Sequence, residues 1–172
     1  MKIPQKTKAE ILNEAEARGY DFEENHHGCA QCVLGALMEL FDMKDPNAFK
    51  AATGLGGGVG LSIEGSCGGL TGGVMAISMW YGRELDNIAD PEGVRFRSYR
   101  LAEKLHDRFV KEYASSICKE IHKKVLGRPY RLSLPDEFEA FLDAGGHEEK
   151  CPGVVGKAAR WAAEIILEQE GL

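Results

Sequence analysis

Residues 67–82 read CGGLTGGVMAISMWYG, an uncharged stretch in which a cysteine is followed by two pairs of glycines. The pairs Gly68–Gly69 and Gly72–Gly73 are four residues apart, so they would share one face of a helix. Glycine weakens a helix, and its use here indicates that another backbone approaches closely. The stretch predicts a buried helix over Gly68–Tyr81, which is too short for a convincing membrane span. A lipid-packed Gly-xxx-Gly helix is the alternative.

The rest of the chain has helical periodicity and almost no strand pattern. A capping box, Thr7–Glu10, marks the first helix start, and Gly19 is predicted to end that helix. Further helices are predicted from about Cys29, from Pro46 to Ala52, over residues 91–117, from Pro135 and from Pro152. The inward face of 91–117 is expected to hold Phe96, Tyr99, Ala102, Leu105, Phe109 and Tyr113. The pattern predicts a single all-α domain over residues 1–172, in which a glycine-rich loop leads into the buried glycine-rich helix.

Charge and composition narrow the classes of partner. The net charge of -6 argues against nucleic acid or anionic lipid as the main partner. The first twenty residues contain no apolar signal segment, so we expect a cytoplasmic protein. In that compartment, five cysteines favour free thiols, metal ligands or catalytic groups over structural disulfides.

Three cysteines stand at predicted helix starts, namely Cys29, Cys67 and Cys151. A helix N-terminus offers free N–H groups and a partial positive charge, both of which favour thiolate and lower a cysteine pKa. Thiolate is the form that binds metal or attacks a disulfide. The alternative is that each cysteine is a small buried apolar residue.

Other motifs give weaker signals. Cys29 and Cys32 form a CxxC, but no βαβ pattern surrounds it, and Cys32 could equally be a core residue. The loop GLGGGVG, residues 54–60, matches neither the dinucleotide fingerprint nor the P-loop, so a nucleotide site is not expected. Its backbone N–H groups could instead point at sulfur atoms.

His26 and His27 could bind metal, although exposed loop histidines explain them as well. No role is assigned to His106, His122 or His147.

Several segments together resemble the C-GCAxxG-C-C family of redox-active proteins. They are GCAQCVLGAL (28–37), GLGGGVG (54–60) and CGGLTGG (67–73), with the isolated Cys118 and Cys151. The resemblance extends over about residues 25–167. It implies that the four family cysteines are Cys29, Cys67, Cys118 and Cys151, with Cys32 as an extra one. Gly69 stands at the alanine of the family's CGAxxG motif. The resemblance also extends distantly to an iron–sulfur domain associated with split-Soret cytochromes, whose haem attachment motif CxxCH is absent here.

The resemblance and the helix starts together suggest an iron–sulfur cluster for electron transfer or redox sensing, bound by Cys29, Cys67, Cys118 and Cys151. Gly68 and Gly69 would then lie at the cofactor and donate N–H groups to its sulfurs. Three alternatives remain open: a metal-free thiol–disulfide oxidoreductase, a structural zinc site, and a helical domain with inert core cysteines. The redox partner is not identified by the sequence. The glycine face of 68–81 could serve a homodimer or pack within one chain.

Overall fold

The computed structural model describes residues 2–172, and within that range it contains α-helices and short helical turns but no β-strand. The helices are α1 Lys8–His26, α2 Cys29–Leu40, α3 Pro46–Ala51, α4 Gly68–Tyr81, α5 Val94–Tyr113, α6 Cys118–Leu126, α7 Pro135–Asp143 and α8 Cys151–Gln169. The short turns are η1 Thr53–Leu55, η2 Leu85–Asn87 and the π-helical η3 Gly146–Lys150. The predicted all-α class is confirmed.

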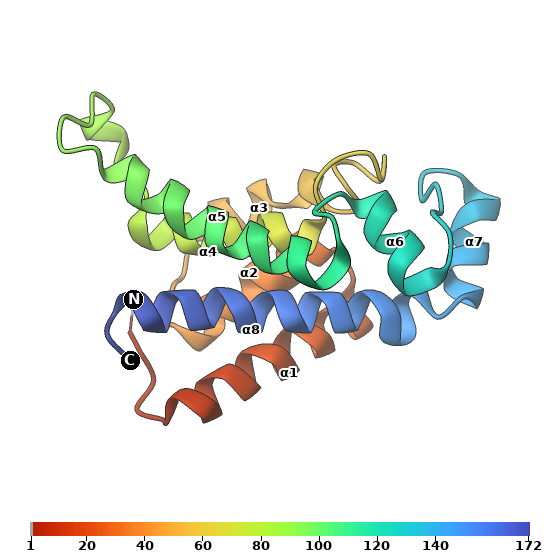
Figure 1. The fold of residues 1–172 in the computed structure, drawn as a ribbon, viewed down its shortest axis with the longest axis horizontal. Coiled ribbons are helices and arrows are strands. Elements are labelled where there is room, and N and C mark those ends of the chain that lie inside the picture. The colour runs from red at the N-terminus through yellow and green to blue at the C-terminus, as the bar shows by residue number, and fades with distance from the viewer. Residues whose placement is uncertain (1) are drawn as a thin grey trace.

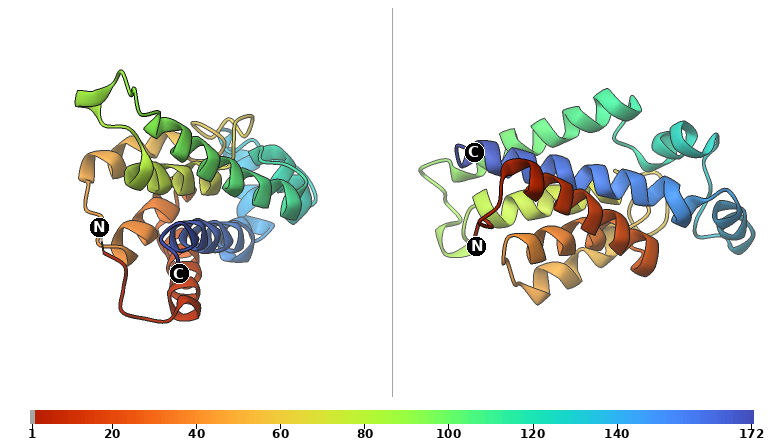
Figure 2. Two further views of the ribbon diagram at one scale, coloured as in Figure 1. Left: turned by 60° about the vertical axis from the view of Figure 1, so that its left-hand side comes forward. Right: turned by 90° about the horizontal axis from the view of Figure 1, so that it is seen from below.

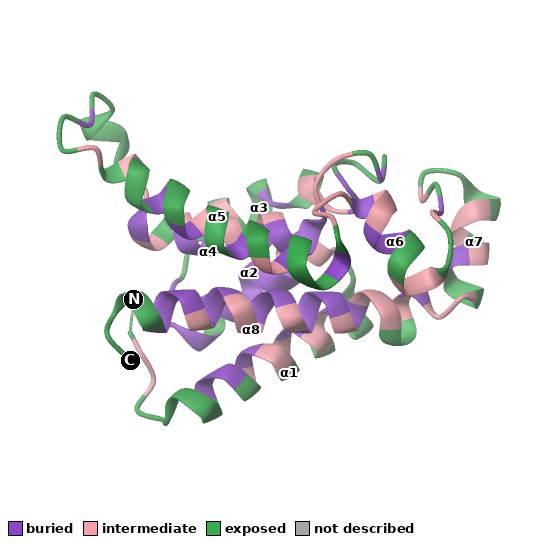
Figure 3. Ribbon diagram, viewed as in Figure 1, coloured by how far each residue is buried: buried purple, intermediate pink, exposed green. Residues whose placement is uncertain are grey.

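The last helix, α8, is the centre of the bundle (Figures 1 and 2). It packs against α1, α2, α4 and α5, and its buried face includes Val155, Ala159, Ala162 and Ile166. Figure 3 shows the buried residues following α8 and the facing sides of its neighbours. Alanines on α8 let the helices around it come close, and the longest shared interface is with α1.

The first helix begins at the predicted capping box, where the Thr7 hydroxyl accepts the Glu10 N–H and the Glu10 carboxylate accepts the Thr7 N–H. The prediction that it ends at Gly19 is wrong, because α1 continues to His26. Gly19 lies where α1 crosses α8, and a methyl group there would stand 2.9 Å from the Ala159 Cβ. The glycine is therefore required by helix packing rather than by helix termination.

The glycine pairs of α4 allow close packing inside this chain. A methyl group at Gly72 would lie 2.2 Å from the Ala30 carbonyl oxygen in α2. One at Gly73 would lie 2.6 Å from Leu105 Cδ2 in α5. The glycine face of α4 is thus covered by α2, α5 and α8, so a homodimer is not needed to explain it.

The N-terminal part of α5 projects beyond the bundle together with η2 (Figure 1). As a result Phe96 and Tyr99, which were predicted to face the core, are 49% and 59% exposed. The periodicity is correct further along, since Leu105, Phe109 and Tyr113 are buried. Asp90 caps this helix through its carboxylate, which accepts the Val94 and Arg95 N–H groups. The predicted stripe was placed on the wrong face in these turns, because Ser98 and Leu101 are the buried residues there and the Ser98 hydroxyl lies 2.9 Å from Ser78 Oγ of α4.

The glycine-rich loop between η1 and α4 is joined to the start of α6 by backbone hydrogen bonds. The Cys67 N–H donates to the Ser116 carbonyl at 2.9 Å, and the Cys118 N–H donates to the Gly65 carbonyl at 3.0 Å. These bonds bring Cys67 and Cys118 to the same end of the bundle, although 51 positions separate them in the sequence.

Candidate functional site

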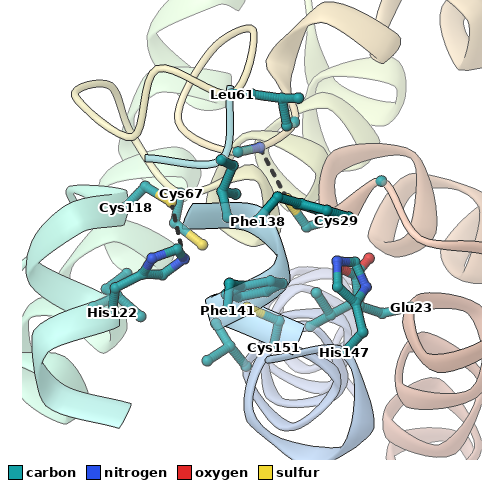
Figure 4. A pocket seen from close by; sticks show the side chains of 17 residues that line it. Glu23, Cys29, Leu61, Cys67, Cys118, His122, Phe138, Phe141, His147 and Cys151 are labelled. Carbon is teal, nitrogen blue, oxygen red and sulfur yellow. Dashed lines mark hydrogen bonds between the residues drawn. The ribbon is translucent and has the colours of Figure 1, made fainter. Parts of the chain in front are cut away.

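Four of the five cysteines line one cavity of about 80 Å³ at the end of the bundle where α2, α4, α6 and α8 begin (Figure 4). Cys29 is the first residue of α2, Cys118 of α6 and Cys151 of α8, and Cys67 is the N-cap of α4. Cys29, Cys67 and Cys118 therefore stand at helix N-termini, whereas Cys151 follows directly on the π-helical turn η3 and its N–H is already bonded to the Gly146 carbonyl. The structure confirms the predicted helix starts at Cys29 and Cys67. It moves the last start from Pro152 to Cys151, and it adds a fourth at Cys118.

The backbone around Cys29 is shaped by glycines from two segments. The Gly57 N–H of the glycine-rich loop donates to the Cys29 Sγ at 3.5 Å. A methyl group at Gly68 would stand only 2.2 Å from that sulfur. One at Gly69 would be 3.7 Å from the Cys67 Sγ, an ordinary van der Waals distance. Gly68 therefore provides the space that the Cys29 sulfur occupies, whereas Gly69 has no such steric role at the sulfur of Cys67.

Burial determines the ionisation of these thiols. It raises the pKa of Cys67 and of Cys118 to about 12, and it raises the pKa of Cys29 and Cys151 well above the ordinary value. Smaller causes are repulsion from the Glu23 carboxylate and then from the other three thiolates, both of which oppose the ionisation of Cys151. The expectation that helix N-termini would lower these pKa values is wrong. The loss of hydration exceeds the favourable N–H contacts from Gly57 to Cys29 and from Gly69 and Leu70 to Cys67.

The chain matches the model of a known protein family over most of its length. A family model described as "Putative redox-active protein (C_GCAxxG_C_C)" matches residues 27–165. The chain belongs to this family. The matched range contains all four cysteines that line the cavity. Searches of curated proteins and of solved structures found no match.

In this C-GCAxxG-C-C protein, three polar side chains that the sequence analysis missed also line the cavity: Glu23, His122 and His147. Glu23 Oε2, His122 Nδ1 and His147 Nδ1 are buried and have no hydrogen-bond partner. Glu23 is 3% exposed and His122 is 2% exposed. Burial raises the pKa of Glu23 to about 7 and lowers the pKa of His122 and of His147 to about 4.

Two of these three groups had a signal in the sequence. Glu23 continues the buried row Ile11, Ala15 and Gly19 at intervals of four residues, so helical periodicity places it on the inward face of α1. His122 follows Cys118 by four residues, which places both on one face of α6. His147 lies in the short π-helical turn η3, whose residues form no periodic pattern in the sequence.

Aromatic side chains from α7 form one wall of the cavity. Phe141 stacks on His122, with ring centroids 5.5 Å apart, and meets His147 edge-on at 5.0 Å. Phe138 lies beside Phe141 and also lines the cavity. This apolar wall excludes water from both imidazole rings, which is the cause of their lowered pKa values.

The fifth cysteine, Cys32, is buried but does not line the cavity. Its thiol donates to the His27 carbonyl at 3.1 Å and also contacts the Glu23 carboxyl group. His26 and His27 are both exposed, and the His27 ring packs edge-on against His147. The structure thus separates Cys32 from the four cavity cysteines and places neither His26 nor His27 among the cavity-lining residues.

Within residues 2–172, no three His, Cys, Asp or Glu side chains are placed to hold a single metal ion. Over the same range, no helix has both the length and the apolar character needed to cross a membrane.

Proposed function

We propose that this redox-active protein holds an iron–sulfur cluster through Cys29, Cys67, Cys118 and Cys151, and that it transfers electrons or senses redox state. The observation that carries the proposal is the convergence of four cysteines, each from a different helix, on one cavity. Iron–sulfur clusters are held by four cysteine thiolates, and these four side chains are separate from the packed core sulfur of Cys32.

The arrangement fits a polynuclear centre better than a single ion. A structural zinc ion requires all four sulfurs at about 2.3 Å from one point. Here the cysteines surround a space of about 80 Å³. In a cluster, different irons bind different thiolates, so the sulfurs can lie around a volume. The raised pKa values support a cationic centre of either kind, because buried thiols become thiolates readily only beside a positive charge.

The surrounding residues would tune such a centre. A bound cluster supplies one-electron transfer at a potential set by its charge, hydrogen bonds and solvent exposure. Gly57 donates its N–H to Cys29, and His122 Nε2 faces the Cys118 sulfur at 3.7 Å. Phe138 and Phe141 keep water away from the cavity, while Gly68 leaves room for the Cys29 side chain.

The test is the visible spectrum with iron and acid-labile sulfide analysis of protein purified without oxygen. We expect brown protein containing iron and sulfide in matched amounts. Each single serine variant at Cys29, Cys67, Cys118 or Cys151 should lose or alter the chromophore. The Cys32→Ser variant should retain it. Colourless protein without iron, zinc in place of iron, or four serine variants that all keep their iron and spectrum would contradict the proposal.

A further inference from the structure

The extra cysteine of this chain lies one helical turn from a cavity cysteine. Cys29 and Cys32 both belong to the first turn of α2. In an α-helix, residues three apart have Cα atoms about 5 Å apart, which follows from the rise and radius of the helix. That separation lies within the Cα range that a disulfide spans. Cys29 is the less buried residue of the pair and lines the cavity, whereas Cys32 is buried outside it, so Cys29 is the one that an incoming disulfide would reach first.

A buried carboxyl group stands beside this pair. Glu23 contacts the Cys32 thiol from α1, and its Oε2 atom is buried without a hydrogen-bond partner. The Cys32 thiol meanwhile donates to the His27 carbonyl, which can hold the proton of Cys32 but cannot take it. A carboxylate in contact with a buried thiol is a proton acceptor placed at the atom that must ionise.

We propose that Cys29 and Cys32 form a reversible disulfide in the cluster-free protein, with Glu23 accepting the proton of Cys32. This chemistry goes beyond the proposed electron transfer and does not depend on it, because it needs only the two thiols, Glu23 and an incoming disulfide. Cys29 takes part in both states, so the disulfide and a cluster bound at Cys29 exclude each other. The pair would make cluster binding conditional on reduction of the Cys29–Cys32 bond.

The reaction is an exchange with a small-molecule disulfide as oxidant. Cys29 releases its proton to water and attacks one sulfur of that disulfide, whose S–S bond breaks; the other sulfur leaves as a thiolate and takes up a proton from water. Cys32 then gives its proton to Glu23 and attacks the Cys29 sulfur, which releases the second thiolate. The protein dithiol loses two electrons and two protons. The incoming disulfide gains them and becomes two thiols, the second proton arriving through Glu23.

The bond can be located by mass because of where trypsin cuts. Arg18 and Lys44 bound a peptide, residues 19–44, that contains both Cys29 and Cys32 and no other cysteine. Cys67, Cys118 and Cys151 fall on three different peptides. Metal-free reduced protein is exposed to oxidised glutathione and its remaining thiols are alkylated. The tryptic peptides are then measured by mass spectrometry. We expect peptide 19–44 unalkylated and lighter than its reduced form by two hydrogen atoms. Alkylation of both cysteines, or a cross-link from this peptide to another, would overturn the proposal.

Matched variants separate this proposal from the cluster. Cys118→Ser should lose the cluster and keep the Cys29–Cys32 bond, whereas Cys32→Ser should keep the cluster and lose the bond. Glu23→Gln should slow closure of the mixed disulfide by at least about tenfold, with folding checked by circular dichroism. If it closes at the wild-type rate, Glu23 is not the proton acceptor. If protein purified without oxygen contains no iron and yet forms the Cys29–Cys32 bond, the cluster proposal alone has failed.

Discussion

The Cys118 Sγ lies 3.7 Å from Nε2 of His122, one turn further along α6. His122 is 2% exposed, and burial lowers its pKa to about 4, so the ring is neutral at pH 7. A neutral imidazole carries one N–H, and Nδ1 has no acceptor here. A thiolate at Cys118 therefore favours the proton on Nε2, where it becomes a hydrogen-bond donor to the sulfur. His122 is thus a positioning residue for Cys118.

Replacing His122 with leucine should lower the midpoint potential of the bound cluster, because a hydrogen bond to a ligand sulfur stabilises the more negative reduced state. A net hydrogen bond of about 1 kcal/mol corresponds to about 40 mV for one electron. Redox titration followed by visible absorption measures the change. His106→Leu on the exposed face of α5 is the control and should leave the potential unchanged. An unchanged potential in His122→Leu with full iron content would contradict the role given to this ring.

Replacing Glu23 with glutamine should alter how stability depends on pH. The folded pKa of Glu23 is about 7 against an ordinary 4.5, because burial disfavours the charge. The stability that protonated Glu23 contributes is fully present below pH 4.5 and is lost as pH rises through 7. The full shift corresponds to about 3 kcal/mol. In urea unfolding of metal-free protein, the free energy of unfolding of Glu23→Gln should therefore rise relative to that of the wild type between pH 5 and pH 8. A constant difference over this range would show that Glu23 does not titrate in it.

Replacing Gly68 with alanine should displace the Cys29 sulfur, since the new methyl group would lie 2.2 Å from it and 2.9 Å from the Ala30 nitrogen. Overpacking of this kind costs about 1–3 kcal/mol, and we expect iron content to fall as well. Gly153→Ala in the first turn of α8 is the matched control, because its methyl group would meet no atom within 4 Å. That variant should be neutral or stabilised by up to about 1 kcal/mol. Urea unfolding and iron analysis test both, and equal behaviour of the two variants would contradict the steric argument.

Local sequence signals predicted the framework of the cavity. Cys29 and Cys67 could be placed at helix starts because capping and breaking residues act within one turn. The spacing of Gly68 and Gly72 predicted close backbone approach for the same local reason. Local signals failed where the outcome depended on a distant neighbour. Gly19 is predicted to end a helix, but it is needed where α8 crosses α1. Tyr99 is predicted to be buried, but α4 packs on the face of α5 that carries Ser98.

The sequence by itself determined that the chain is all-α, that Cys29 and Cys67 stand at helix starts, and that the glycines of α4 face a neighbour. Only the tertiary structure decided that Cys118 begins a helix beside the other cysteines, that Cys32 turns away toward Glu23, and that burial raises the thiol pKa values. The physical reason is the distance along the sequence over which each effect acts. Helix periodicity and capping act over a few residues, whereas desolvation and the convergence of side chains depend on which distant segments pack together.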